Sequence, residues 1–250
     1  MRYQLRQWML WITTVPMMVI AFISAGSDGA RIGGAIGNIH LNAPMVIANQ
    51  LGILSIVAMF LVTVFIAGTV LRDQEVGIAD LLFATPMRKV DYLLGRFLAG
   101  FLVCLVIFAL VVLAMLIGST MSYVDPERLS KFSVAPYLFS FFVFIVPNLL
   151  FVSALLMLLA ATTRSLILVY VGVLGFMVLW AIAGALRSFP GAENVAVMLD
   201  PFGVRALAEM TKYFTSEEAN NLVPSFSGIL LFNRVLWSCV SLALFAATVA

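Results

Sequence analysis

The residues best placed for specific chemistry lie in one charged interruption of an otherwise apolar chain, from Arg72 to Arg96. The flanking stretches 45–71 and 97–117 are almost free of charge. If those stretches cross a membrane, the interruption presents a charged surface to a partner in water, where carboxylates and guanidinium groups form charge-assisted hydrogen bonds. Its ionisable residues are Arg72, Asp73, Glu75, Asp80, Arg88, Lys89, Asp91 and Arg96.

The residue sets that catalysis or metal binding would need do not occur together in the sequence. His40 is the only histidine, and Cys104 and Cys239 fall inside apolar runs, where we interpret them as buried hydrophobic residues. The glycine-rich stretch 25–44 lacks a following Gly-Lys-Ser/Thr, so we interpret it as a flexible external loop and not a nucleotide-binding loop. An enzyme needs a nucleophile and a base, or metal ligands, in one place. We therefore predict no catalytic, cofactor-binding or metal site on this chain.

Composition decides the class of protein. Hydrophobic residues make up 63% of the chain and charged residues 10%, whereas soluble domains average about 45–50% and about 25%. The mean hydropathy is +1.12. So few charges cannot cover a water-facing globule, and we predict an all-α membrane protein with a single domain over residues 1–250. The net charge of +2 gives no reason to expect a nucleic-acid partner.

Six apolar runs are long enough to be membrane helices, which need roughly 20 apolar residues each. The first contains Pro16 and resembles a secretion signal, but Trp8 and Trp11 favour a permanent anchor at the membrane interface. The last run reaches Ala250 without a flanking charge, which leaves open a continuation beyond it. The predicted spans are 8–24, 45–71, 93–117, 136–161, 166–186 and 230–250.

The distribution of basic residues favours an N-terminus on the cytoplasmic side. By count, the basic residues divide equally between the two sides. The positive-inside rule gives most weight to short loops and to the first spans. Arg2 and Arg6 lie directly before the first span, and four basic residues flank the short loop after the second span.

The segment 187–229 is predicted to be an outer loop that contains two short helices. Asp200 is a favourable N-cap with Pro201 at the first helical position, and an apolar stripe follows. Thr215 and Glu218 have the spacing of a capping box, which predicts a second short helix before Pro224. The apolar stripe consists of Phe202, Leu207, Met210 and Phe214.

The segment 72–92 is predicted to hold a short helix that lies across the inner membrane surface. Residues from Glu75 to Phe83 place their apolar side chains on one side, and Thr85-Pro86 ends the helix because proline disfavours helix in the preceding residue. A helix fixed at both ends to long spans would move both spans when a partner pushes on it. The alternative is a solvated loop that only sets the topology.

These residues carry a family resemblance. The motif reads Glu75-x-Gly77-x-x-Asp80-Leu81-Leu82-x-x-Thr85-Pro86, followed by Gly95-Arg96. It resembles the coupling-helix region of ABC-2-type exporter permeases, and the six predicted spans match that family over nearly all of the chain. The chain has Ile78 where the family usually has threonine and Arg96 where lysine is common. Such permeases usually begin with an amphipathic helix, whereas only residues 1–7 precede the first span here.

Further residues resemble one branch of these permeases, in which a long membrane protein carries an M1-type aminopeptidase domain. No zinc-binding His-Glu-x-x-His occurs in the chain, so a peptidase would lie beyond Ala250 or on another chain. The residues that carry this resemblance are Arg2-Tyr3-Gln4-Leu5-Arg6, Asp200-Pro201-Phe202-Gly203, Thr211, Tyr213, Thr215, Asn220 and Asn233-Arg234-x-x-Trp237.

The resemblance implies a mechanism in the cytoplasmic membrane of a bacterium. Two permease units, identical or different, form the pathway, and two copies of an ABC ATPase subunit bind below them with ATP and Mg. No Walker motif is present here, so ATP hydrolysis would lie on that partner. The residues implied for the ATPase contact are Arg72, Glu75, Gly77, Asp80, Leu81, Leu82, Thr85, Pro86 and Arg88.

A substrate pathway would run between the second and fifth spans of the two units. Polar residues on the second span that could line it are Asn49, Gln50, Ser55 and Thr63. The alternative for these residues is helix–helix packing, which uses the same small polar side chains.

Two rival classes receive less support. A proton- or sodium-coupled transporter usually has an acid, histidine or lysine inside its spans, and the predicted hydrocarbon cores contain none. A non-transporting scaffold that binds a cytoplasmic partner through 72–96, or the membrane part of a longer peptidase-linked protein, is the alternative to a permease.

Overall fold

The computed structural model describes residues 8–26, 38–57, 59–75, 88–122 and 124–249. This part of the chain is all-helical, as predicted, and contains no strand. The longer helices are α2 (Trp8–Gly26), α3 (Pro44–Val57), α4 (Met59–Glu75), α6 (Lys89–Gly118), α8 (Val146–Thr163), α9 (Leu166–Ala185) and α13 (Gly228–Val249). The shorter ones are η2 (Pro126–Arg128), α7 (Ala135–Ser140), the π-helix η3 (Phe141–Ile145), η4 (Leu186–Ser188), α10 (Glu193–Met198), α11 (Val204–Met210) and α12 (Ser216–Asn221).

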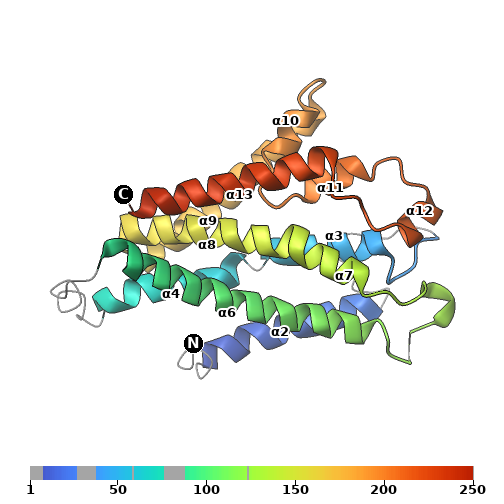
Figure 1. The fold of residues 1–250 in the computed structure, drawn as a ribbon, viewed down its shortest axis with the longest axis horizontal. Helices are drawn as coiled ribbons and strands as arrows, with labels where there is room; N and C mark the ends of the chain where they lie inside the picture. Colours follow the sequence, from blue (N-terminus) through green and yellow to red (C-terminus); the bar gives the residue numbers. More distant parts are fainter. Residues whose placement is uncertain (1–7, 27–37, 58, 76–87, 123, 250) are drawn as a thin grey trace.

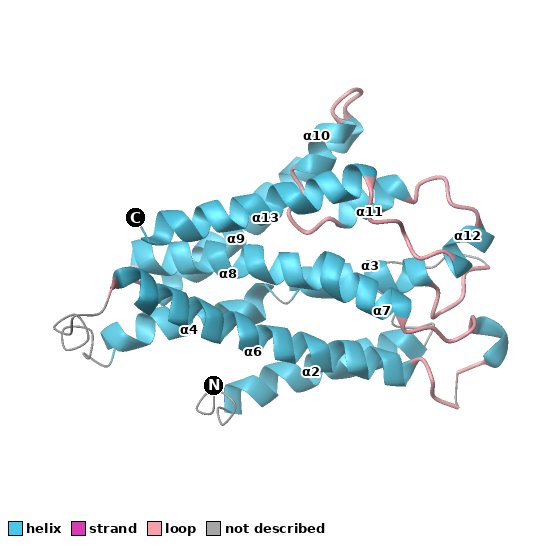
Figure 2. Cartoon of the chain, viewed as in Figure 1, coloured by secondary structure: helices cyan, strands magenta, loops and turns pink. Residues whose placement is uncertain are grey.

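The long helices run side by side between two ends of a bundle (Figure 1). One end holds the end of α4, the start of α6, the turn between α8 and α9 and the end of α13; we call it the α4–α6 end. The other holds residues 38–43, 124–134 and 211–227; we call it the loop end, and most of the connecting loops gather there (Figure 2).

Four helices are long and apolar enough to cross a membrane, and they match the last four predicted spans. They are Lys89–Gly118, Ala135–Thr163, Leu166–Ser188 and Gly228–Val249. The helix α2 coincides with the predicted first span, but its apolar part, Leu10–Gly26, is shorter than these four. The described chain is thus a multi-pass bundle with four candidate spans, or five when the bent pair α3–α4 is included.

The second predicted span, 45–71, is bent in the structure, and its crossing of the membrane stays a prediction. Helices α3 and α4 meet at an angle of 45°, which makes the second apolar run a broken span or a re-entrant segment. Ser55, in the last turn of α3, donates its hydroxyl hydrogen to the Gly52 carbonyl at 2.6 Å. Serine side chains that bond back to the preceding turn compete with the helix and often bend it. The small polar residues of this run therefore give a local reason for the break.

Helix α8 forms the centre of the bundle. The span that contains α8 has 61% of its apolar window buried, against 11% for the span that begins with α9. The helices α4 and α13 pack against α8, while α2 packs on α6. Helix α9 keeps one face exposed along its length, as expected for a helix beside lipid, with Leu174, Val178 and Ile182 more than half exposed.

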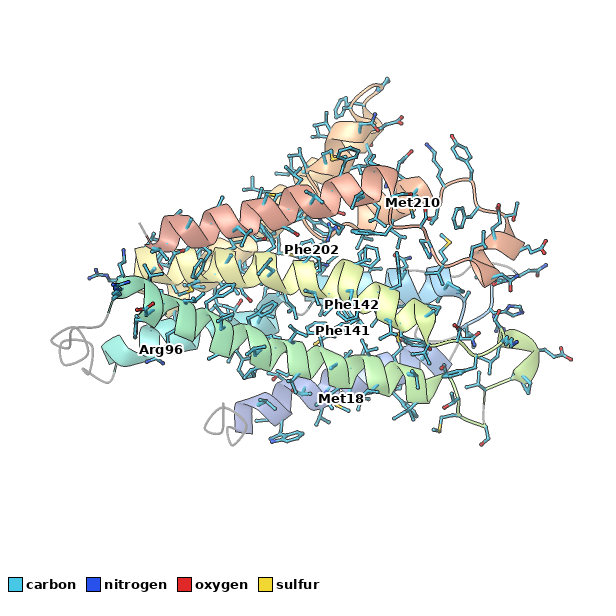
Figure 3. All side chains as sticks on the ribbon, viewed as in Figure 1. Met18, Arg96, Phe141, Phe142, Phe202 and Met210 are labelled. Atoms are coloured by element: carbon cyan, nitrogen blue, oxygen red, sulfur yellow. The ribbon has the colours of Figure 1, made fainter. Side chains whose placement is uncertain are left out.

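A π-helical turn interrupts the fourth predicted span. Residues Phe141–Ile145 form this turn between α7 and α8, and Pro147 follows it at the start of α8. Proline removes a helical N–H donor and crowds the preceding turn, and a single π-turn inside an α-helix is often found at a functional site. Figure 3 labels Phe141 and Phe142 at this turn. The irregularity places Asn148 just beyond the proline, on the buried side of α8.

The outer-loop helices were predicted in part. Thr215 and Glu218 form the predicted capping box of α12: Glu218 N donates to Thr215 Oγ1 at 3.3 Å, and Thr215 N donates to the Glu218 carboxylate at 2.8 Å. The hydrogen bonds that Thr215 N and Thr215 Oγ1 donate to the Glu218 carboxylate lower the pKa of Glu218. The predicted helix start at Pro201 is wrong, because α11 begins at Val204 with Gly203 as its N-cap.

Close packing between α2 and α6 depends on Gly118. A Cβ atom at Gly118 would lie 2.5 Å from the Phe22 carbonyl oxygen and 3.1 Å from the Phe22 Cα. Small residues allow this approach of helix backbones in membrane proteins. We predict that Gly118→Ala lowers the free energy of unfolding by about 1–3 kcal/mol, as overpacking does.

The matched control for that prediction is Gly95→Ala on the same helix, where a Cβ atom would meet nothing within 4 Å. This variant should be neutral or gain up to about 1 kcal/mol of helix propensity. Equilibrium unfolding of both variants in mixed micelles checks the pair, and equal stabilities would contradict the close-packing argument.

Candidate functional site

The predicted ATPase contact lies mainly outside the described residues. This holds for Gly77, Asp80, Leu81, Leu82, Thr85 and Pro86, and for the core of the predicted coupling helix. Of the others, Arg72 and Glu75 belong to the last turn of α4, and Arg88 is an exposed residue that precedes α6 in an extended conformation. Since α4 and α6 pack against each other, the structure brings both ends of the segment to the α4–α6 end of the bundle.

The four predicted pathway residues all lie on α3 and α4. Asn49 is half-buried, whereas Gln50, Ser55 and Thr63 are buried inside this one chain. Gln50 Nε2 donates to the Ser24 carbonyl at 3.3 Å, and Thr63 Oγ1 donates to the Met59 carbonyl at 2.8 Å. The Gln50 Oε1 atom is buried and has no hydrogen-bond partner among the described residues. A role in a pathway between two units stays a prediction.

Two motifs far apart in the sequence meet near the loop end. The turn Asp200–Gly203 precedes α11, and Asn233-Arg234 lies in the second turn of α13. Arg234 is 2% exposed, and Asp200 and Asn233 are fully buried. A buried guanidinium in a membrane helix is costly unless polar groups surround it. We call the polar side chains that surround Arg234 the Arg234 network: Ser55, Asn148, Trp180, Asp200, Asn233 and Arg234 itself.

Arg234 donates hydrogen bonds to four groups, of which the Asp200 carbonyl, 3.5 Å from Nη2, is the most distant. Its Nη1 donates to Asn148 Oδ1 at 2.8 Å, its Nη2 to the Pro201 carbonyl at 3.0 Å, and its Nε to Asn233 Oδ1 at 3.0 Å. The fork of the guanidinium therefore holds α8, α13 and the 200–203 turn in one arrangement. Hydrogen bonds from a charged donor are worth about 1.5–3 kcal/mol each when the alternative is an unmet buried group.

The Asp200 carboxylate supplies a negative charge beside Arg234 and accepts three hydrogen bonds of its own. Trp180 Nε1 and Arg205 N each donate to it at 2.7 Å, and Phe202 N donates at 3.2 Å. The bond from Arg205 N explains why Asp200 resembles an N-cap in the sequence. The Asp200 carboxylate does bind the first turn of α11, but Asp200 lies three residues before the N-cap, Gly203.

The network extends to the break between α3 and α4. Asn148 Nδ2 donates to Ser55 Oγ at 2.7 Å and to the Phe202 carbonyl at 3.1 Å. Ser55 is the residue whose hydroxyl bonds back to Gly52. The break in the second apolar run, the π-turn before Asn148 and the 200–203 turn are thus joined by side-chain hydrogen bonds.

Apolar and backbone contacts enclose these polar groups. Phe202 is fully buried, lies between α8 and α13 in Figure 3, and packs edge-on against Trp180 with ring centroids 5.5 Å apart. Trp237 Nε1 donates to the Met198 carbonyl at 2.9 Å, and Asn233 Nδ2 donates to the Val197 carbonyl at 2.8 Å. The network is therefore shielded from lipid and tied to α10.

Arg205 covers the rim of the network. Its guanidinium lies over the Trp180 ring, 4.7 Å from the centroid, and its Nη2 donates to the Trp180 carbonyl at 2.7 Å. Burial lowers the pKa of Arg205, the nearby Asp200 carboxylate opposes this shift, and Arg187 adds to it. Arg205 remains a cation at any physiological pH because the ordinary pKa of arginine is so high.

The site has the character of a structural junction. Among the described residues, no group of three or more His, Cys, Asp or Glu could hold a metal ion. His40 was predicted to lie in a flexible loop, but two hydrogen bonds fix its position. Its Nδ1 lies 2.8 Å from Ser130 Oγ, and its backbone N donates to Asn220 Oδ1 at 2.8 Å.

The comparison with known families fits this architecture. A family model described as ABC-2 family transporter protein matches residues 42–249. The chain belongs to this family. The match begins just before α3, so this ABC-2 family protein has α2 outside the matched part, while the Arg234 network and the α4–α6 segment lie inside it. No match was found among curated proteins. Members of the family are membrane components of transporters that typically work with an ABC ATPase.

The sequence pointed to most of the network without indicating its role. Asp200, Asn233 and Arg234 were noticed through the branch resemblance, and Ser55 as a pathway candidate. Asn148 and Trp180 were missed as site residues. The available signals were an asparagine after proline inside an apolar run and an arginine six residues into the last span of this ABC-2 protein.

Removal of the Arg234 side chain should destabilise the ABC-2 protein strongly. Arg234→Leu leaves the Asn148 and Asn233 oxygens unpaired and Asp200 without its neighbouring cation, so we expect a loss of about 3 kcal/mol in the free energy of unfolding. Arg234→Lys should lose less, since it keeps the charge but not the planar fork.

Arg187→Leu is the control for this prediction. Its side chain is 39% exposed and pairs with Glu209 at 3.3 Å, so we expect a change below about 1 kcal/mol. Unfolding of the three variants in mixed micelles measures the difference. Equal losses in Arg234→Leu and Arg187→Leu would show that the network does not support the fold.

Gly203 should tolerate no side chain. Its φ of +73° favours glycine, and a Cβ atom there would lie 2.4 Å from Arg234 Cζ. We predict that Gly203→Ala destabilises by the roughly 1–2 kcal/mol of the left-handed backbone and additionally by displacement of Arg234.

Gly191→Ala isolates the backbone contribution, because Gly191 has a φ of +82° and a Cβ atom there would meet nothing within 4 Å. Thermal unfolding of both variants checks the prediction. A loss in Gly203→Ala no greater than that in Gly191→Ala would contradict the contact with Arg234.

Proposed function

We propose that this chain is the membrane-spanning permease subunit of an ATP-driven ABC-2-type exporter. The observation that carries the proposal is the family match over residues 42–249. We place the protein in the cytoplasmic membrane of a bacterium, with its N-terminus inside. The described helices are compatible with that orientation, since the end of α4, the start of α6 and the α8–α9 turn share one end of the bundle, and α2 begins on the same side (Figure 1).

The basic residues near that end support the same orientation. Arg88, Lys89 and Arg164 are all exposed there, where the positive-inside rule expects them on a cytoplasmic surface. Arg164 lies in the turn between α8 and α9 with a φ of +49°. In this orientation the loop end faces the outside.

The proposed mechanism needs two permease units, identical or different, and two ABC ATPase subunits that bind ATP and Mg. ATP chemistry lies on the ATPase, and this chain contributes no catalytic residue. Segment 72–92 transmits the movement of the ATPase to α4 and α6. Since α4 packs on both α6 and α8, a displacement of α4 reaches the centre of the bundle.

The Arg234 network keeps part of the bundle in place while α4 and α6 move. It holds α8, α13 and the last turn of α3 together near the loop end, whereas α4 begins beyond the 45° bend. We therefore propose that α4 and α6 move relative to α3 about that bend while the loop end keeps its arrangement.

The Glu75→Lys variant tests the proposal. In mild detergent, an ATPase with Walker motifs should co-purify with the wild-type chain at a stoichiometric level, and Glu75→Lys should reduce its recovery by about tenfold, the effect of losing one important interface contact. Glu127→Lys is the matched control, because it makes the same charge reversal at an exposed residue of η2, at the loop end.

Two outcomes would count against a permease. Absence of an ATPase from every sample would sink the proposed partnership. Recovery of an ATPase whose ATP turnover is unaffected by Glu75→Lys would favour a scaffold that binds the ATPase without being driven by it.

A further inference from the structure

A pocket of about 320 Å³ opens at the loop end, between three segments of the chain. Its walls come from residues 42–44, 130–136 and 220–223. This volume lies at the lower end of the range of about 300–1,000 Å³ that is usual for small-molecule sites. The pocket is separate from the Arg234 network, with which it shares no residue.

Side-chain amides hold the walls of this pocket in place. Ser130 N donates to Asn42 Oδ1 at 2.6 Å, and Asn42 Nδ2 donates back to the Ser130 carbonyl at 2.8 Å. Asn220 accepts from His40 N at 2.8 Å and donates to the Asn38 carbonyl at 2.9 Å. Two of the lining amides are therefore used to build the pocket, which is formed before any ligand arrives.

The lining combines one positive charge, a set of serine and asparagine side chains, and a smaller apolar part. Among the described residues that line the pocket, Lys131 is the only charged one. It is exposed, and among the described residues no acidic side chain lies within ion-pairing distance of it. Phe132 is 50% exposed and Val223 37% exposed, and both border the pocket together with Pro44 and Pro136.

One pocket residue, Pro136, relates the pocket to the candidate spans. Pro136 belongs to the first turn of the candidate span Ala135–Thr163, and the polar head groups of a bilayer begin where such a span begins. An amphiphile in the membrane would present its head group to Lys131 while its chain stayed near Phe132 and Val223.

We propose that this pocket binds an anionic head group that is attached to an apolar chain, such as a lipid phosphate. Lys131 pairs with the anion, and Phe132 and Val223 contact the start of the chain. The assignment does not depend on ATP-driven export, because binding at the loop end requires no ATPase. Another basic cluster at Arg187 and Lys212 fits such a ligand less well, since Glu209 already pairs with both cations at 3.3 Å.

The test uses the full chain in dodecyl maltoside micelles and two probes, dodecyl phosphate and inorganic phosphate. Calorimetric titration measures their affinities for the wild type and for Lys131→Ala, Val223→Trp and Lys212→Ala. Lys212→Ala removes the same charge from an exposed lysine outside the pocket. Val223→Trp fills the pocket and keeps Lys131.

We expect dodecyl phosphate to bind about tenfold more weakly to Lys131→Ala and to Val223→Trp, and with wild-type affinity to Lys212→Ala. Equal weakening in Lys131→Ala and Lys212→Ala would overturn the proposal, since it would show a general effect of net charge. Inorganic phosphate that binds as tightly as dodecyl phosphate would also overturn it, because the apolar wall would then contribute nothing. Undiminished binding to Val223→Trp would place the amphiphile elsewhere.

Discussion

The structure depends on one requirement: a guanidinium buried inside a bundle of apolar helices must find acceptors for its N–H groups within the protein. Water supplies such partners to a surface arginine, but Arg234 is 2% exposed and has to use Asn148, Asn233 and the Pro201 carbonyl. Each acceptor can reach Arg234 only if the helix or turn that carries it has a particular local geometry. The carbonyl points at Arg234 because the chain turns sharply at Gly203, and Asn148 is in reach where the π-turn ends. The turn at Gly203 and the π-turn before Asn148 look independent in the sequence, but both bring an acceptor to Arg234.

This arrangement divides the bundle into two parts with different constraints. Near the loop end, side chains link residues that are far apart in the chain, through Arg234 on one side and through His40, Asn42 and Asn220 on the other. Towards the α4–α6 end the packing of the helices is mainly apolar, with Phe97 and Phe245 in ring contact at 4.9 Å. Apolar surfaces can slide with little loss, whereas a buried hydrogen bond has to be exchanged for another. Movement driven from the α4–α6 end would therefore concentrate at the bend between α3 and α4, next to Ser55.

The sequence predicted what depends on short-range patterns. Four apolar runs became long helices because length and composition suffice for a membrane helix, and the capping box at Thr215 was recognised because its two bonds span only three residues. The bend at Val57 was not predicted, since hydropathy treats Gly52 and Ser55 as tolerable members of an apolar run. The helix start at Pro201 was misplaced because the helix begins only after the left-handed Gly203. The Asp200 carboxylate binds backbone N–H groups as predicted, but it also binds Trp180, which lies 20 residues away. The bond from Arg234 to Asn148 joins residues 86 apart, and no local pattern encodes such a partner. What the sequence did show was the unusual presence of those polar residues in apolar surroundings.

The side chains of the Arg234 network also indicate whether proton binding could drive a movement of the helices. Its members inside the spans, apart from Arg234, are Ser55, Asn148, Asn233 and Trp180, and none of these carries an ionisable acid or base that titrates near neutral pH. An aspartate in place of Asn148 would pair with Arg234 more strongly, but it would also introduce a group whose protonation could break that pair. A secondary transporter uses such a group to couple transport to proton flow. The carboxylate of the network, Asp200, lies in the turn before α11 and not on a spanning helix. An asparagine keeps the geometry of the contact between α8 and Arg234 and introduces no titratable group there, so this contact changes when its helices are displaced. That property fits the proposed permease, whose energy would come from a separate ATPase.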